Sequence, residues 1–220
     1  DAAESFDFYA FNLGDHYGAV EEKVGSEAIS KVLYPNDGTD EGRRLRLKQQ
    51  HFFVSCSLQD MIRNLDMRGI PIHEFPDHWA VQLNDTHPAI AVAELMRLLL
   101  DDKWLEWDQA WAITCRSLAC TIQTTMPESL ENWELDLFGS LLPRHLEIIN
   151  EINRRFLQQV RLKYPGNEQI LRRVSFIDEE GHKAVRMAHL ATVACHHVNG
   201  VAALHSELVH TDLLPEFAAL

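Results

Sequence analysis

The feature that most constrains the fold of this chain is a strand-like run that passes through a polar turn into a helix. Trp79-Ala80-Val81-Gln82-Leu83 has the composition of a short buried strand, and residues 89–101 have the pattern of a helix. Residues 84–88 join them. Strand, polar turn and helix in succession are typical of proteins that pack helices on a sheet. We therefore predict a helix-rich α/β fold.

The joining turn, Asn84-Asp85-Thr86-His87-Pro88, has two interpretations. A structural one is that Asp85 or Thr86 caps the following helix and that Pro88 occupies its first turn. This leaves Asn84 and His87 unexplained. Ligands of open α/β sheets bind just beyond the carboxyl ends of strands, where an amide, a carboxylate and an imidazole can hydrogen-bond sugar hydroxyls. A metal-dependent hydrolase built on Asp85 and His87 is a third hypothesis.

Helical patterns dominate the rest of the chain, and strand signals are few. The only further strand that we predict is Val174–Ile177. Two strands make a narrow sheet, so either the sheet is small or its other strands lie outside this chain. No linker-like segment divides the chain, and we expect a single unit. The predicted helices cover residues 17–33, a segment from after Gly42 to about residue 69, 89–101, 107–121, about 143–164 and 186–197.

Charge and composition exclude several classes of function. The net charge is −13, which argues against a nucleic-acid surface, and no segment approaches a membrane span or a signal peptide. Hydrophobic residues make up 46% and charged residues 24%, as in globular proteins. The chain starts at Asp1 without Met and stops at Leu220, as a piece of a longer polypeptide would.

Cysteine, histidine and tryptophan patterns suggest no further chemistry. The four cysteines form no CxxC pair, which favours reduced thiols of a cytoplasmic protein. The histidines show no metal-ligand spacing, and we predict no metal site; those of the helix at 186–197 are interpreted as packed or partly exposed, and His145 as structural. The tryptophans are interpreted as core residues rather than a sugar-stacking platform: Trp104, Trp107, Trp111 and Trp133.

Five runs of sequence, in order along the chain, resemble the α-glucan phosphorylase family. The longest contains the polar turn and continues into the helix after it. The runs are Val32-Leu33-Tyr34-Pro35-Asn36-Asp37, Leu45-Arg46-Leu47-Lys48-Gln49, residues 81–95, Leu141-Leu142-Pro143-Arg144-His145-Leu146-Glu147-Ile148-Ile149 and Val198-Asn199-Gly200-Val201-Ala202. Their common order over nearly the whole chain makes a chance match improbable.

The resemblance implies the residues of a glucose subsite. Asp85 and His87 match loop residues beside the sugar, and Asn199 and Val201 match a second segment lining the same crevice, with Val201 close to the sugar. Residues 36–40 match a mobile loop that gates access. No catalytic residue is expected within the chain itself.

The resemblance also implies the fold, cofactor and partners of the parent protein. Residues 1–220 would be part of the N-terminal, glucan-binding, Rossmann-like domain of a two-domain, glycosyltransferase-B-type phosphorylase. The family releases glucose 1-phosphate from glycogen or maltodextrin with inorganic phosphate and retains the anomeric configuration. Its cofactor is pyridoxal phosphate, whose lysine belongs to the absent C-terminal domain. A homodimeric, cytoplasmic parent is expected.

Two departures from the family pattern bear on activity. Ile122 and Gln123 stand where the family has Asn and His, and that His contacts the glucose through its main chain; Gln123 therefore remains a candidate substrate-binding residue. Arg63-Asn64 stands where animal enzymes place two arginines for nucleotide activation, so we expect that switch to be absent or weak. We expect the isolated chain to be inactive. The alternative is a non-catalytic carbohydrate-binding or structural module.

Overall fold

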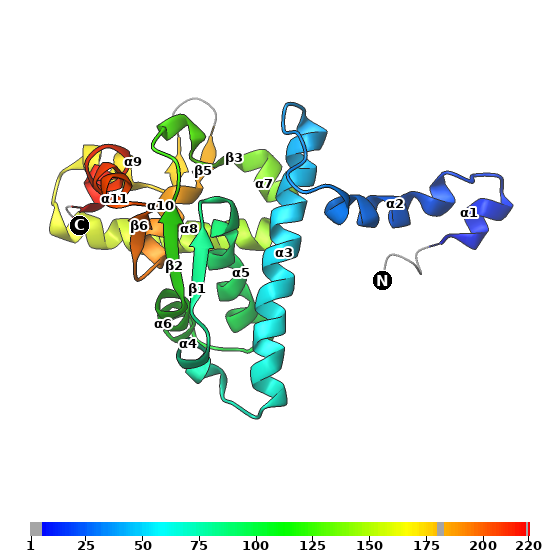
Figure 1. Cartoon of the computed structure of the whole chain (residues 1–220), viewed down its shortest axis with the longest axis horizontal. Coiled ribbons are helices and arrows are strands. Elements are labelled where there is room, and N and C mark those ends of the chain that lie inside the picture. The colour runs from blue at the N-terminus through cyan, green and yellow to red at the C-terminus, as the bar shows by residue number, and fades with distance from the viewer. Residues whose placement is uncertain (1–5, 180–182, 219) are drawn as a thin grey trace. The chain divides into compact units, whose positions relative to one another are not determined.

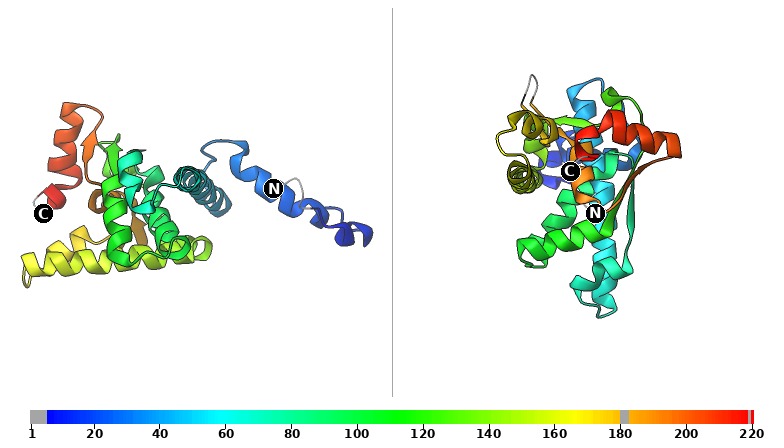
Figure 2. Two further views of the ribbon diagram at one scale, coloured as in Figure 1. Left: turned by 90° about the horizontal axis from the view of Figure 1, so that it is seen from below. Right: turned by 90° about the vertical axis from the view of Figure 1, so that its left-hand side faces the viewer.

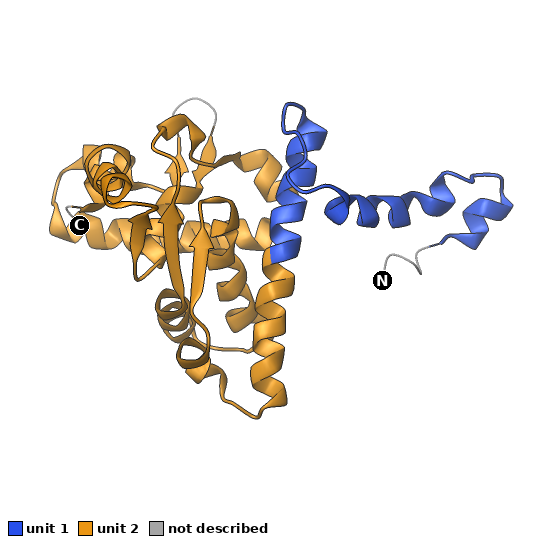
Figure 3. Cartoon of the chain, viewed as in Figure 1, with its two compact units in different colours: residues 1–53 blue, residues 54–220 orange. Residues whose placement is uncertain are grey.

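The computed structural model describes residues 6–179, 183–218 and 220. The chain forms two compact units, residues 1–53 and 54–220 (Figure 3), rather than the single unit expected from the sequence. The division falls inside the long helix α3 (Asp40–Met67), so no change of composition marks it. Among the described residues, no helix combines the length and apolar character needed to cross a membrane.

Unit 1 contains α1 (Phe8–Asn12), α2 (Gly18–Lys31) and the first part of α3. The predicted helix over 17–33 is confirmed as α2. Gln49 of α3 contacts the end of α2, because its Nε2 donates to the carbonyls of Ile29 and Val32 at 2.7 and 2.8 Å. The loop matched to the family's gate makes local contacts, with Asp37 paired to Arg46 at 2.8 Å.

The helix predicted from after Gly42 to about residue 69 is confirmed as α3, which begins earlier than predicted, at Asp40. It stops where Gly69 adopts a φ of +66°, a left-handed conformation that glycine tolerates. The second predicted long helix is also confirmed, as α8 (Pro143–Lys163), with Pro143 in its first turn. Figure 2 shows α8 along one side of unit 2, with α11 (Ala203–Leu208) at the opposite side.

A three-stranded parallel sheet with the order β1-β2-β6 organises unit 2 (Figure 1). Its strands are β1 (Val81–Asn84), β2 (Leu118–Ile122) and β6 (Val198–Gly200). Asn84 lies opposite Thr121, and Thr121 lies opposite Asn199. The carboxyl ends of three strands that are far apart in sequence are therefore brought to one edge.

Two predicted helices end earlier than expected, and β2 and β6 take the residues that follow. The helix predicted over 107–121 is α6 (Trp107–Ser117), after which the chain enters the central strand. The helix predicted over 186–197 is α10 (Met187–Ala194), which packs against β2. A short apolar run such as that of β2 fits a buried strand or a buried helix equally well, so periodicity alone did not find it.

A second, antiparallel sheet has the order β3-β5-β4. It consists of β3 (Asn132–Glu134), β5 (Ala184–Arg186) and β4 (Ile177–Asp178). The strand predicted over 174–177 is wrong except at its last residue, because α9 (Glu168–Val174) continues through its first. Phe156, Phe176 and Phe217 stack beside this region, with ring centroids 5.5 and 6.0 Å apart.

The predicted helix over 89–101 is confirmed in path, but only its centre is α-helical. It consists of the 3₁₀-helix η3 (His87–Ile90), α5 (Ala91–Arg97) and the π-helical turn η4 (Leu98–Asp102). Five of the seven α5 residues are buried apolar side chains, which anchors this helix in the core. The remaining elements are η2 (Ile72–Glu74), α4 (Phe75–His78), η5 (Pro127–Ser129), α7 (Leu135–Leu141), η6 (Val209–Leu213) and α12 (Pro215–Ala218).

Candidate functional site

The residues predicted to bind substrate come from three separate segments, and these segments meet at the carboxyl edge of the parallel sheet. Asp85 and His87 directly follow β1, Gln123 follows β2, and Asn199 lies in β6 with Val201 just beyond it. Because the strands are parallel and in register, these five residues share one edge of unit 2. The sheet order explains why residues so far apart in the sequence lie at the same edge.

Asp85 has an unusual backbone conformation, with φ at +70°. Aspartate tolerates this left-handed region better than most residues, and such conformations cluster at functional sites. The Asp85 amide donates to the Thr121 carbonyl at 2.8 Å, and its Oδ1 accepts from the Thr86 amide at 2.7 Å. Among the described residues only Oδ1 of this carboxylate is bonded, which leaves Oδ2 available to a ligand hydroxyl.

The capping role expected of Asp85 or Thr86 is wrong. Thr86 is the residue before η3, yet neither side chain bonds a helix amide further along. The Thr86 hydroxyl is buried and instead accepts from the Glu131 amide at 3.3 Å, linking the turn to the start of β3. Pro88 does occupy the first turn of η3, as expected, and half-buried His87 begins that helix.

The two residues that depart from the family pattern point to opposite sides of β2. Ile122 is fully buried, so its side chain contributes to the core. Gln123 is exposed, and its Nε2 donates to Oδ1 of Asn84 at the end of β1. A cross-strand amide pair therefore occupies the rim beside Asp85. This contact was not predicted, because only the strand pairing places the two amides side by side.

A chain of side-chain hydrogen bonds crosses all three strands. Nε2 of Gln82 donates to Oγ1 of Thr121 at 2.9 Å, and that hydroxyl donates to Oδ1 of Asn199 at 3.3 Å. Nδ2 of Asn199 donates to the Gly200 carbonyl at 2.8 Å. The sequence reasoning singled out neither Gln82 nor Thr121, and alternation along a strand is the only signal that could have placed them on this face.

The chemistry of this edge suits a neutral, hydroxyl-rich ligand. It offers carboxamides, a hydroxyl, one carboxylate and an imidazole. Val201, with 53% of its surface exposed, supplies an apolar contact. Such groups hydrogen-bond to hydroxyls as donors and acceptors without demanding a charged partner.

Comparison with known proteins identifies the family to which the chain belongs. The family described as "Carbohydrate phosphorylase" matches residues 1–220, the whole chain. The chain belongs to the carbohydrate phosphorylase family. The resemblance inferred from the five sequence runs is thereby confirmed.

Similar curated proteins are glycogen phosphorylases from distant organisms. The chain is 60% identical to "Glycogen phosphorylase" of Synechocystis over 100% of its length and 26% of the relative's. It is 49% identical to "Glycogen phosphorylase 2" of Dictyostelium discoideum over 98% of the chain and 22% of the relative. It is 46% identical to the human "Glycogen phosphorylase, liver form" over 100% of the chain and 27% of the relative. The chain thus spans about a quarter of the length of these relatives.

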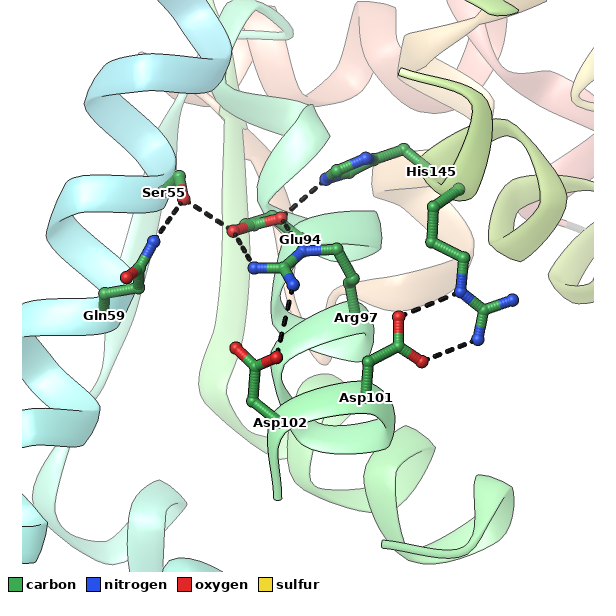
Figure 4. A network of polar contacts seen from close by, with 8 residues as sticks. Ser55, Gln59, Glu94, Arg97, Asp101, Asp102 and His145 are labelled. Carbon is green, nitrogen blue, oxygen red and sulfur yellow. Dashed lines mark hydrogen bonds and ion pairs between the residues drawn. The ribbon is translucent and has the colours of Figure 1, made fainter. Parts of the chain in front are cut away.

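A second polar cluster of this phosphorylase-family chain lies inside unit 2, around Glu94 of α5 (Figure 4). Glu94 is fully buried, and its carboxylate accepts two hydrogen bonds from Arg97, at 2.9 and 3.0 Å. Ser55 of α3 donates to it at 2.6 Å, and Nε2 of His145 of α8 lies 2.6 Å away. The cluster joins three helices, and the sequence analysis missed it because Glu94 looks like an ordinary helix residue.

The structural interpretation of His145 is supported by its place in this cluster. It is 4% exposed and reaches Glu94 rather than the neighbouring Glu147, which instead pairs with Arg144 at 3.0 Å. Arg144 also donates two hydrogen bonds to the Asp101 carboxylate, at 2.9 and 2.7 Å, and this contact lowers the pKa of the Asp101 carboxyl. These ion pairs fix the start of α8 against the end of the α5 region.

The histidines near the chain's end do not share one helix, contrary to expectation. His189 lies in α10, whereas His196 and His197 lie beyond its end and before β6. Burial lowers the pKa of His189 to about 4, and its Nδ1 is 3.0 Å from the Ser175 carbonyl oxygen. His189 is therefore a neutral packing residue at neutral pH.

The tryptophans only partly follow the expectation that they are core residues. Trp133 is 4% exposed and belongs to the core, but Trp104 is 85% exposed, with a φ of +57°. The Arg155 guanidinium lies 4.7 Å from the ring centroid of Trp107. Arg155 is held there by Asp108 at 3.0 Å. Helical spacing did not predict which of these tryptophans are buried and which are exposed, because spacing gives no information about what packs against each face of a helix.

Proposed function

We propose that this chain is part of the N-terminal domain of an α-1,4-glucan phosphorylase and supplies one wall of its glucose subsite. The observation that carries the proposal is the meeting of Asp85, His87, Gln123, Asn199 and Val201 at one strand edge in a member of this family. The parent protein would release glucose 1-phosphate from glycogen or maltodextrin with inorganic phosphate. It would have the two-domain glycosyltransferase-B-type fold and act as a homodimer.

The wall would bind and orient the terminal glucose without taking part in bond breaking. The free Oδ2 of Asp85 accepts from one sugar hydroxyl, and Asn199 donates to another, while Val201 contacts the apolar face of the ring. Holding the sugar in one orientation lowers the entropic cost of reaching the transition state. A second domain closing over this edge would exclude water and so favour phosphate over water as the attacking group.

The family's cofactor, pyridoxal phosphate, would be held by the rest of the parent protein. Of the described lysines, Lys103 pairs with Asp66 at 2.7 Å and Lys163 donates to the Leu220 carbonyl at 2.8 Å. None of the described lysines lies among the strand-end residues, so this wall lacks a group to hold the cofactor's aldehyde. When bound, the cofactor would supply a phosphate group able to exchange protons with the substrate phosphate.

The proposal is tested by glucose 1-phosphate release from maltoheptaose, inorganic phosphate and pyridoxal phosphate. We expect no product from the chain alone and product when the C-terminal half of a phosphorylase is supplied in trans. Release by the chain alone would overturn the proposal, which assigns the bond-breaking groups to the rest of the parent protein. Saturable maltoheptaose binding with no product in either mixture would favour the non-catalytic carbohydrate-binding module.

A further inference from the structure

The side chains of Gln82, Thr121 and Asn199 form a hydrogen-bonded relay with a single direction. A carboxamide nitrogen only donates, so the 2.9 Å contact from Nε2 of Gln82 makes Oγ1 of Thr121 the acceptor. A hydroxyl has one proton, and the one on Thr121 is then directed to Oδ1 of Asn199 at 3.3 Å. Gln82 thus sets the polarity of the relay, and Thr121 transmits it.

The relay fixes which way the Asn199 carboxamide faces. Its oxygen accepts from Thr121, and one N–H donates to the Gly200 carbonyl at 2.8 Å. A flipped amide would set N–H against the Thr121 proton and oxygen against the carbonyl, losing both bonds. Within the described part of the chain, one N–H of Asn199 is left over, and it is the only donor of this side chain that a ligand can use.

The backbone beside Asn199 is held as firmly as its side chain. The Gly200 amide donates to Oγ of Ser206 at 3.0 Å. A Cβ at position 200 would lie 2.5 Å from the backbone carbon and the Cβ of His205, so only glycine fits. Side chain and main chain are therefore both fixed before any ligand arrives, as a preorganised binding group requires.

We propose that Gln82 and Thr121 are positioning residues, which hold Asn199 so that its remaining N–H donates to a hydroxyl of the terminal glucose. The role rests on the proposed function of this edge. Neither residue needs to touch the sugar. They ensure that Asn199 offers the ligand an N–H donor and not an acceptor. The sugar atom that faces this N–H must therefore be a hydroxyl oxygen that accepts a hydrogen bond.

The matched pair of variants is Thr121→Val, which keeps the shape and removes the hydroxyl, and Thr121→Ser, which keeps the hydroxyl. Thr211→Val, at an exposed threonine in η6, is the control for a lost hydroxyl elsewhere. The Asn199 side-chain NH₂ signals are followed by NMR in the ¹⁵N-labelled 220-residue chain, without ligand and during a titration with maltoheptaose.

In Thr121→Val we expect the two Asn199 NH₂ protons to change shift and to exchange faster with solvent before ligand is added. We expect maltoheptaose affinity to fall about two- to tenfold, the effect of one hydrogen bond. Thr121→Ser and Thr211→Val should match the unchanged chain. Gln82→Met, at an exposed position, should show a smaller change in the same direction and keeps the test decisive if Thr121→Val does not fold.

Two results would overturn the proposal, and they differ. If Thr121→Val and Gln82→Met bind maltoheptaose as the unchanged chain does, with the same Asn199 signals, the relay does not position Asn199 and the proposed function stands. In the second result, the unchanged chain binds no maltoheptaose, although the Asn199 signals differ between the unchanged chain and Thr121→Val. The proposed glucan site is then wrong, and the positioning role is wrong with it.

Discussion

Replacing Glu94 by glutamine tests whether the buried cluster stabilises unit 2. The carboxylate accepts bonds from Arg97, Ser55 and His145, and the bonded contact with Arg97 raises the pKa of that guanidinium. Glutamine keeps one oxygen but turns an NH₂ group toward Arg97, which cannot accept a hydrogen bond, so one Arg97 bond and the negative charge that compensates the guanidinium are lost. Because the residue is fully buried, water cannot replace them.

The expected loss follows from what remains after the substitution. Removing one partner of a buried ion pair costs roughly 3–5 kcal/mol, since the other charge is left uncompensated. Here the side chain of Arg97 is 23% exposed, and its Nη1 lies 3.5 Å from Asp102, so part of its charge stays compensated. We therefore expect Glu94→Gln to lower the free energy of unfolding by about 3 kcal/mol, the lower end of that range.

Urea unfolding followed by tryptophan fluorescence is the assay, because all five tryptophans lie in residues 54–220 and report on unit 2. The matched control is Glu147→Gln, which removes a carboxylate that is 68% exposed and bonded to Arg144. That surface pair should contribute at most about 1 kcal/mol. If Glu94→Gln costs no more than the control, the cluster does not stabilise the fold and the reasoning is refuted.

Three further predictions concern single sites. Burial lowers the pKa of His189 to about 4, so the free energy of unfolding is highest above the unfolded-state pKa of about 6.5. It should fall by up to about 3 kcal/mol as the pH is lowered from 6.5 to 4. In urea titrations at each pH, His189→Asn should reduce this dependence on pH. Gly200→Ala should lower the free energy of unfolding by about 1–3 kcal/mol in urea titration, since its Cβ meets His205, and an unchanged midpoint would contradict the tight fit. Burial and the nearby Asp85 carboxylate raise the pKa of Cys120 to about 12, so mass spectrometry should find iodoacetamide on exposed Cys56 long before Cys120, and equal rates would show that the thiol is accessible.

The sequence located the polar turn between β1 and η3 from local signals. Pro88 after a strand-like run located the turn, and family-like runs indicated Asp85, His87, Asn199 and Val201. These signals are local, because each depends on residues next to one another in the chain. The left-handed φ of Asp85 was not predicted, since the bond to the Thr121 carbonyl that accompanies it comes from another strand.

The strands were harder to predict than the helices. Long helices such as α3 and α8 repeat their apolar pattern over many turns, so their existence was clear. The strands β2 and β6 are short, and the first follows a helix with no turn residue between. The central strand β2 forms because β1 and β6 on either side of it offer backbone hydrogen bonds, and that information is not local.

By itself, the sequence determined the long helices, the polar turn, the acidic composition and the family, because each is recorded in consecutive residues. Only the tertiary structure decided that Gln82, Thr121 and Asn199 form one relay and that Ser55, Glu94 and His145 form one cluster. The physical reason is that a hydrogen bond between side chains depends on distance and direction in space. Parallel strand register and helix packing set both, and they join positions that are tens of residues apart in the chain.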